Sequence, residues 1–274
     1  MRFSFVRPRA ELQPYIESLW VFESPVGMPP TDTNMAAPNG RPKLIIPYEN
    51  SLVSTADGRT SISHEGGLYF VGNRDTQTII QSSARETGFV AIEFSPCGAF
   101  PFFGIPMEQT ASGLFDSETL FGKWGGEVRE SLHNIEDVNQ KVRFIQERLV
   151  RLLYETPRHN ALIEFCVRAL RLSGGRCAIK ELERTTGYSR RYLDLLFNRH
   201  VGLSPKVLAG IFRFQTFYRK WACGLPYDDL KEELYDYYYD QAHFTKEFKR
   251  MTGYSPRKFI LEVSNEFGRR ISLT

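Results

Sequence analysis

The sequence of 274 residues lacks the marks of several protein classes. It has no run of about 18 apolar residues, which excludes a membrane-spanning helix of ordinary length. Its first ten residues hold three arginines and no long apolar stretch, so we expect no secretory signal there. The four cysteines lie far apart without a Cys-x-x-Cys pair, which argues against a zinc site or disulfide framework and favours a reducing, cytoplasmic location.

Histidine is also scarce, with five in the chain. The first half has only His64 and His133, which lack the spacing of a centre built from two histidines and a carboxylate. We therefore predict no metal, no cofactor and no catalytic residue. The content of 42% hydrophobic and 24% charged residues is typical of a globular protein, and the length suggests two domains.

The charge is divided unevenly along the chain. Residues 1–157 carry a net charge of −5, whereas residues 158–274 carry +8, and together these give the overall +3. Such a division favours a basic module that meets a polyanion and an acidic module that does not.

The first half has the pattern of a β-rich domain. Short runs of β-branched and aromatic residues, bounded by turn residues, predict strands over 15–23, 42–48, 68–71, 78–81 and 88–94. Short strands at this spacing are typical of a β-barrel or sandwich.

A helical stripe follows over 134–153. It consists of Ile135, Val138, Val142, Ile145 and Leu149 at alternating steps of three and four. The stripe either packs on its own barrel or forms a seam with a second copy in a homodimer. Thr156-Pro157 then predicts a break, and with it domains 1–156 and 157–274.

The second half has no strand pattern and repeats itself. We expect helices over 159–172, 178–186, 190–200, 205–222, 228–236, 241–251 and 256–263. The motif Phe197-x4-Gly202-x-Ser204-Pro205 returns as Phe248-x4-Gly253-x-Ser255-Pro256, 51 residues later. Each copy predicts a helix-turn-helix, over 178–200 and 228–251, and the long helix over 205–222 joins them.

Together the segments Gly187 to Leu193, Gly202 to Pro205 and Tyr239 to Pro256 resemble the AraC/XylS family of bacterial transcription regulators, over about residues 160–262. The first half is similar, more weakly, to the sensor domains of that family, through Leu12-Gln13-Pro14-Tyr15 and Pro38-Asn39-Gly40. The resemblance implies an α+β fold. An N-terminal cupin-like β-barrel with C-terminal helices is followed by an all-α domain of two helix-turn-helix units.

The resemblance also implies that both recognition helices enter the major groove of promoter DNA. The expected base contacts are Arg190, Arg191, Asp194, Gln241, Ala242, Thr245 and Lys246, and the expected phosphate contacts are Ser204, Lys206, Arg213, Lys249, Arg250 and Arg257. The sequence departs from the family at Tyr237, where a glycine is common, and at Glu183 and Glu233, where alanine is usual. We expect these glutamates either to tilt outward or to pair with basic residues of the recognition helices.

The aromatic residues of the first half have two interpretations. Trp20, Phe22, Tyr48, Phe70 and Phe94 either line a pocket for a small-molecule effector or form core. The favoured function is a sequence-specific DNA-binding regulator controlled by such an effector, with RNA polymerase as a further partner. A regulator controlled by a protein partner or by its own abundance, and a cupin-type enzyme, stay open as alternatives.

Overall fold

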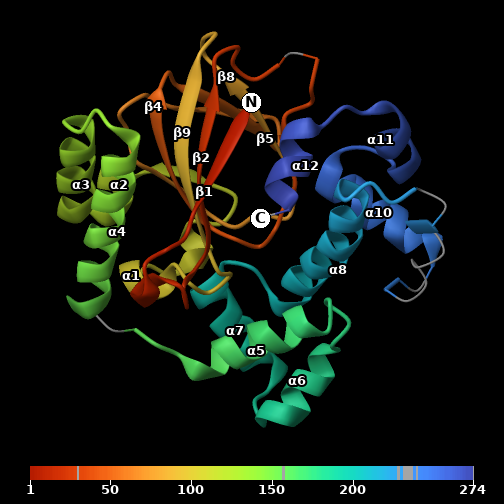
Figure 1. The fold of residues 1–274 in the computed structure, drawn as a ribbon. Coiled ribbons are helices and arrows are strands. Elements are labelled where there is room, and N and C mark those ends of the chain that lie inside the picture. The colour runs from red at the N-terminus through yellow and green to blue at the C-terminus, as the bar shows by residue number, and fades with distance from the viewer. Residues whose placement is uncertain (30, 156–157, 227–228, 231–236, 239, 274) are drawn as a thin grey trace.

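The first half of the chain is built on two antiparallel sheets (Figure 1). The computed structural model describes residues 1–274 except 30, 156–157, 227–228, 231–236, 239 and 274. The larger sheet has the order β1 (Arg2–Val6), β2 (Ile16–Ser24), β9 (Thr87–Phe94), β4 (Lys43–Glu49), β7 (Tyr69–Val71) and β10 (Leu114–Asp116). The smaller has the order β3 (Met35–Ala36), β8 (Thr78–Ser82), β5 (Leu52–Ala56) and β6 (Arg59–Ser63). The cupin-like domain is therefore an open barrel of two separate sheets.

The centre of the larger sheet is buried on both of its faces. Along β2, Leu19 and Val21 point into one core, whereas Trp20 and Phe22 point into another. The neighbouring strand β9 is buried over its whole length. Strands covered on both faces are nearly continuous apolar runs, which is why the sequence predicts β2 and β9 clearly. All five expected strands are confirmed, while β1, β3, β5, β6 and β10 were not expected.

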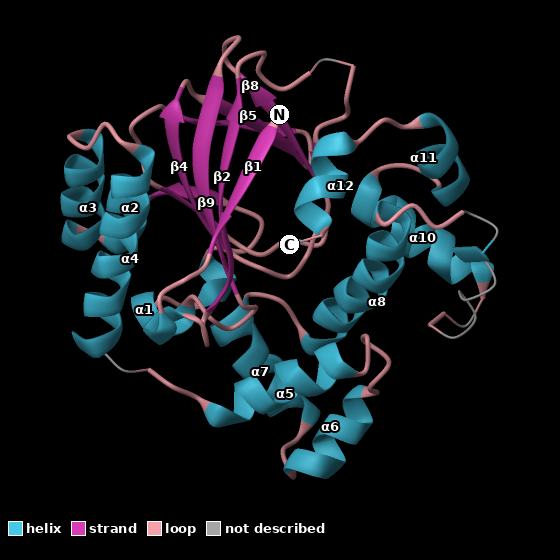
Figure 2. Cartoon of the chain, in the orientation of Figure 1, coloured by secondary structure: helices cyan, strands magenta, loops and turns pink. Residues whose placement is uncertain are grey.

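Helices cover one face of the larger sheet (Figure 2). They are α1 (Phe100–Phe103), α2 (Ser117–Phe121), α3 (Lys123–His133) and α4 (Val138–Glu155), with short 3-10 turns η1 (Ala10–Leu12) and η2 (Met107–Gln109). Val142, Ile145 and Leu149 of α4 are buried in the same core as Leu19 and Val21.

The stripe of α4 therefore packs on its own domain. At its edge, Val138 is half-buried against this core, and Ile135 precedes the helix. Burial within the chain leaves Val142, Ile145 and Leu149 almost no apolar surface for a second copy, so we do not propose a dimer through this stripe.

The second half is helical throughout its described residues. It contains α5 (Ala161–Leu172), α6 (Ile179–Thr186), α7 (Arg190–Val201), α8 (Pro205–Ala222), α10 (Gln241–Thr252), α11 (Pro256–Glu262) and α12 (Glu266–Ser272). Six of the expected helices are confirmed, and α12 was not expected. The helix expected over 228–236 and the break at Thr156-Pro157 lie mostly or wholly outside the described residues.

The two copies of the repeat share their core phenylalanine and their turn glycine in the part of the chain that the structure describes. Phe197 and Phe248 are at most 1% exposed, each in the core of its own unit. The turn glycines Gly202 and Gly253 have φ of +76° and +81°, a conformation that side-chain-bearing residues rarely adopt. Helix α8 supplies buried residues to both cores, and it therefore fixes the spacing of α7 and α10.

The end of the chain returns to the β half. Asn265 bonds the backbone of Met35 twice, accepting from its N–H at 2.9 Å and donating to its carbonyl at 3.0 Å. Phe267 of α12 is fully buried beside Phe22, with ring centroids 5.7 Å apart. The two halves are thus packed against each other rather than joined by a linker alone.

Candidate nucleic-acid interface

The start of α7 is capped by two side chains. Ser189 Oγ accepts the Tyr192 N–H at 3.4 Å, and Glu183 Oε1 accepts the Arg190 N–H at 2.7 Å. The two caps satisfy the N–H groups of Arg190 and Tyr192, which have no partner inside the helix. Glu183 therefore pairs with a basic residue of α7, as the second of the two expectations had it, but through the backbone N–H of Arg190, and it fixes α6 (Ile179–Thr186) against α7. Glu233, its counterpart, lies outside the described residues.

Helix α7 buries one face and exposes the other. Leu193 and Phe197 point into the core, while Arg190 and Arg191 are exposed at the first turn. Asp194 is half-buried and lies 3.8 Å from Arg190, one helical turn away. The structure thus brings the three expected base contacts of this unit onto one solvent-facing surface.

The same surface carries apolar side chains that the sequence reasoning missed. Tyr188 and Tyr192 are exposed and stack with ring centroids 4.8 Å apart. Leu195, one turn further on, is 61% exposed. Tyr188, Tyr192 and Leu195 are four and three positions apart, which places them on one side of the helix beside the exposed arginines. This spacing is the sequence signal that could have identified them as surface residues. Exposed apolar groups on a recognition helix suit contact with thymine methyl groups.

Helix α10 repeats this arrangement. Asp240 Oδ1 accepts the His243 N–H at 2.7 Å and caps the helix. Gln241, Ala242 and Lys246 are exposed, and Thr245 is half-buried. Phe244 and Met251 of the opposite face are buried. The expected base contacts of the second unit therefore also share a solvent-facing surface.

Tyr237 precedes α10 and links the two units. The guanidinium of Arg176, from the loop after α5 (Ala161–Leu172), lies 5.2 Å from the centre of its ring. A cation over an aromatic face is attractive, so the tyrosine at this position makes a contact that a glycine lacks.

Of the expected phosphate contacts, three are freely exposed. Lys206, Lys249 and Arg257 are exposed near the starts of α8 and α11 and the end of α10. Ser204 is half-buried, and its Oγ accepts the Val207 N–H at 3.3 Å as the cap of α8.

Arg213 makes contacts between helices. It is only 17% exposed; it donates to the Gly175 carbonyl at 2.8 Å and lies 3.5 Å from Glu247 of α10. These contacts hold α5, α8 and α10 together, and a phosphate contact by Arg213 stays a prediction.

One loop of the β half, residues 72–77, holds the far ends of both recognition helices. Asn73 Nδ2 donates to the Val201 carbonyl at the end of α7, at 2.9 Å. Asp75 pairs with Arg250 near the end of α10, at 2.6 Å. Gln77 lies directly against Gly253, where an added Cβ would be 2.7 Å from its side-chain nitrogen. The starts of α7 and α10 are thus exposed, while their ends are fixed by the β half.

His200 adds an aromatic contact at the same place. Its ring centre lies 4.1 Å from that of Phe100 in α1. Burial, with a smaller effect of Arg199, lowers the pKa of His200 to about 4. The imidazole is therefore neutral at physiological pH, as suits a side chain packed between the two halves.

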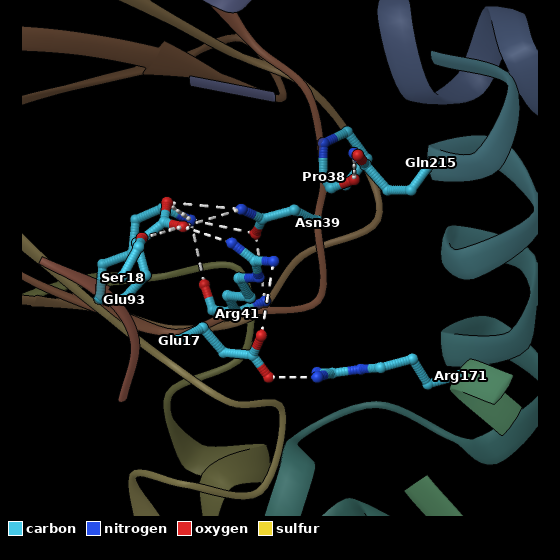
Figure 3. A network of polar contacts seen from close by, with 9 residues as sticks. Glu17, Ser18, Pro38, Asn39, Arg41, Glu93, Arg171 and Gln215 are labelled. Carbon is cyan, nitrogen blue, oxygen red and sulfur yellow. Dashed lines mark hydrogen bonds and ion pairs between the residues drawn. The ribbon is translucent and has the colours of Figure 1, made fainter. Parts of the chain in front are cut away.

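A polar network crosses the junction further along α8 (Figure 3). Glu93 is fully buried and lies 3.0 Å from Arg41 and 3.3 Å from Lys43. Burial raises the pKa of Glu93, but these two cations outweigh it and hold the pKa below its ordinary value. Glu17 bridges Arg41 to Arg171 of α5.

The same loop that carries Arg41 also contacts α8 directly. Gln215 of α8 donates to the Pro38 carbonyl at 2.7 Å. Gly40, with φ of +70°, lies so close to Leu208 that an added Cβ would be 2.8 Å from that side chain. The Pro38-Asn39-Gly40 motif is therefore a contact between the halves.

A cavity of about 540 Å³ lies between the two sheets. Of the five aromatic residues expected at an effector site, only Trp20 lines it. Phe22 is core behind the cavity wall, and Phe70 and Phe94 belong to the core on the helix side, which Tyr48 also contacts. Phe267 and Ile271 of α12 line the cavity too, so the helical half closes part of it.

The described ranges contain no candidate membrane span and no candidate metal site. No helix there is long and apolar enough to cross a membrane. No group of three or more histidine, cysteine, aspartate or glutamate side chains there is placed to hold a metal ion.

Comparisons with known proteins agree with this division. A helix-turn-helix domain family matches residues 182–261, and a domain family of unknown function, DUF6597, matches residues 4–114. No curated protein matches the chain.

Among solved structures, ToxT from Vibrio cholerae in its P21 form is similar at 10% identity, with a TM-score of 0.50 over 91% of this chain and all of that chain. ToxT with a bound unsaturated fatty acid gives a TM-score of 0.49 at 9% identity over 96% and 98%. The cupin domain of Cnp3 from Schizosaccharomyces pombe gives 0.27 at 12% identity over 36% and 65%.

Proposed function

We propose that this chain is a DNA-binding transcription regulator of the AraC/XylS family and reads promoter DNA with α7 and α10 in two neighbouring segments of the major groove. The observation that carries the proposal is the repeated capped helix whose first turns are exposed while its apolar face is buried. Helix α8 joins the cores of both units and sets the distance between them.

The side chains at the two helix starts differ in what they read. Arg190 and Arg191 suit the paired acceptors of guanine, and Gln241 suits adenine. Ala242 and Leu195 suit thymine methyl groups. We therefore propose that the first unit prefers a guanine-containing segment and the second an A·T-containing one.

Sequence-independent affinity comes from the exposed cations around these helices. Lys206, Lys249 and Arg257 are free to meet phosphates. Arg250 is paired with Asp75 through one edge of its guanidinium. We propose that this ion pair breaks before Arg250 contacts a phosphate. Affinity should fall steeply with salt, since each phosphate contact releases counterions.

The β half controls this surface in our proposal. The loop 72–77 lines the cavity between the sheets and also contacts α7 and α10. A small molecule in the cavity would bear on the same loop, and it would shift the population of the DNA-binding arrangement by its preference for one loop conformation. We propose that the chain acts in the cytoplasm by binding alone, with RNA polymerase as a further partner.

Selection of genomic fragments by the full chain, followed by anisotropy titration of the enriched site, tests the proposal. We expect Arg191→Ala to relax the preference at one base pair, at a cost of about 1–3 kcal/mol there. Lys249→Ala should weaken binding to all DNA sequences by a similar factor. Lys123 is an exposed lysine of α3 in the β half. Lys123→Ala is the control and should change neither the base preference nor the overall affinity for DNA. The absence of any enriched sequence would overturn the proposal.

A further inference from the structure

The cavity between the sheets has apolar walls. The apolar side chains that line it include Trp20, Ile45, Leu52, Phe89, Phe115 and Phe267. Its volume of about 540 Å³ is within the range of sites for small organic ligands. The walls therefore suit a molecule with a substantial apolar body.

The polar atoms left without a partner in this cavity are hydrogen-bond donors. Arg74 Nε and Nη1, Trp20 Nε1 and Thr76 Oγ1 are buried, and none of them has a hydrogen-bond partner within the described part of the chain. All three residues line the cavity. Buried donors without acceptors are rare in native proteins, and they indicate an unseen acceptor.

Arg74 is half-buried, and it differs from Arg41 and Lys43, which also line the cavity, in its charge balance. Arg41 and Lys43 lie within 3.3 Å of the buried Glu93. Arg74 donates only to the Ser112 carbonyl, at 2.6 Å, and forms no ion pair with any described residue. Burial is the larger effect and lowers its pKa, while the Asp57 carboxylate at the same cavity raises it. The cavity therefore offers a positive charge that has no carboxylate in ion-pair contact among the described residues.

We propose that the cavity binds an apolar carboxylic acid as its anion, with the carboxylate on the Arg74 guanidinium and the apolar body against Trp20 and Phe89. A carboxylate forms strong charge-assisted hydrogen bonds with a guanidinium, and Nε and Nη1 of Arg74 each lack an acceptor. This inference deepens the effector site proposed above and rests on it. Arg74 stands between Asn73 and Asp75, the residues that contact α7 and α10, so its ligand acts on the loop that holds both recognition helices.

The experiment compares ligands that share a body and differ in charge. Octanoate, decanoate, 4-phenylbutyrate and 2-naphthoate are titrated into the full chain by calorimetry, each beside the alcohol of the same skeleton. We expect at least one carboxylate to bind about tenfold or more tightly than its alcohol. If every carboxylate binds no better than its alcohol, the proposal is overturned.

Two variants locate the anion. Arg74→Gln should remove the preference for the carboxylate, whereas Arg59→Gln, an exposed arginine at the same cavity, should keep it. Loss of the preference in Arg59→Gln alone would contradict the assignment to Arg74. A melting curve guards against misfolding, because removal of an uncompensated buried charge should leave the melting temperature of the ligand-free Arg74→Gln chain unchanged or raised.

DNA binding is measured separately on the same proteins. If the carboxylate binds but leaves DNA affinity unchanged, the ligand class stands and the proposed control of DNA binding fails. If DNA affinity is as expected and no carboxylate is preferred, the ligand class fails alone.

Discussion

Replacement of Asp75 by asparagine should strengthen DNA binding. Asp75 lies 2.6 Å from Arg250, and the two side chains are 31% and 38% exposed. An ion pair at this exposure is worth about 0.2–1 kcal/mol. Because Arg250 must give up this pair before it meets a phosphate, Asp75→Asn should tighten the complex by roughly 1.5- to 5-fold.

Fluorescence anisotropy over a salt series measures this gain. If Arg250 adds one phosphate contact, the logarithmic salt slope should steepen by about 0.9. Glu86→Gln is the matched control, because it removes the same charge from an exposed residue of the β half, directly before β9. It corrects for the change in net charge alone.

A double-mutant cycle provides the refutation. In an Arg250→Gln background the gain from Asp75→Asn should vanish, since no guanidinium remains to be released. A gain that persists in that background, or one that equals the effect of Glu86→Gln, would show that the ion pair does not restrain α10.

Three further predictions concern α7 and its contact with the β half. Leu195→Ala should cost affinity on a site with thymine but little on the same site with uracil, which lacks the methyl group; an equal loss on both would exclude a methyl contact. The pKa of His200 lies near 4 in the folded chain, below its ordinary value of about 6.5, so the unfolded chain binds the proton more tightly. Stability should therefore fall as the pH drops from about 6.5 to about 4, by up to about 3 kcal/mol, and urea melts of His200→Phe should not show this part of the fall. Gly202→Ala should destabilise the chain in the same melts, because φ is +76° there and the new Cβ would lie 2.6 Å from the Met107 carbonyl oxygen; an unchanged midpoint would contradict this packing.

The helical half was predictable because its signals are local. Serine caps, turn glycines and buried phenylalanines repeat at an offset of 51 residues, and each acts within a few residues of its position. Helix α12 escaped prediction because it lacks the serine–proline start that marks α11, which is equally short, and because Phe267 and Asn265 hold it against strands more than 200 residues earlier.

The missed strands carry weak patterns for a related reason. Strands β5 and β6 form a hairpin around Asp57-Gly58, a good turn signal, but most of their residues are polar, and only Leu52 and Ser63 among them are buried. Successive side chains of β2 point to opposite faces of the sheet. This alternation could have placed Trp20 on the cavity face, apart from the helix-side core to which Phe94 of β9 belongs.

The junction could not be predicted from one sequence. The pairs Asp75–Arg250 and Asn73–Val201 join residues that are 175 and 128 positions apart, and no local pattern marks them. The isolated Arg74 gave no signal for the same reason. Arg74 stands out only in the folded chain, where its Nε and Nη1 atoms have no hydrogen-bond acceptor among the described residues.

The central claim is that α7 and α10 enter neighbouring major-groove segments of one duplex. Arg191→Cys and Lys246→Cys, each in a chain with Cys177 and Cys223 replaced by serine, can carry an iron-chelate cleavage reagent. The account predicts two clusters of DNA cleavage, one from each position, about one helical turn or 10 base pairs apart on the same face. A single cluster from both positions, or cleavage from only one of them, would contradict it.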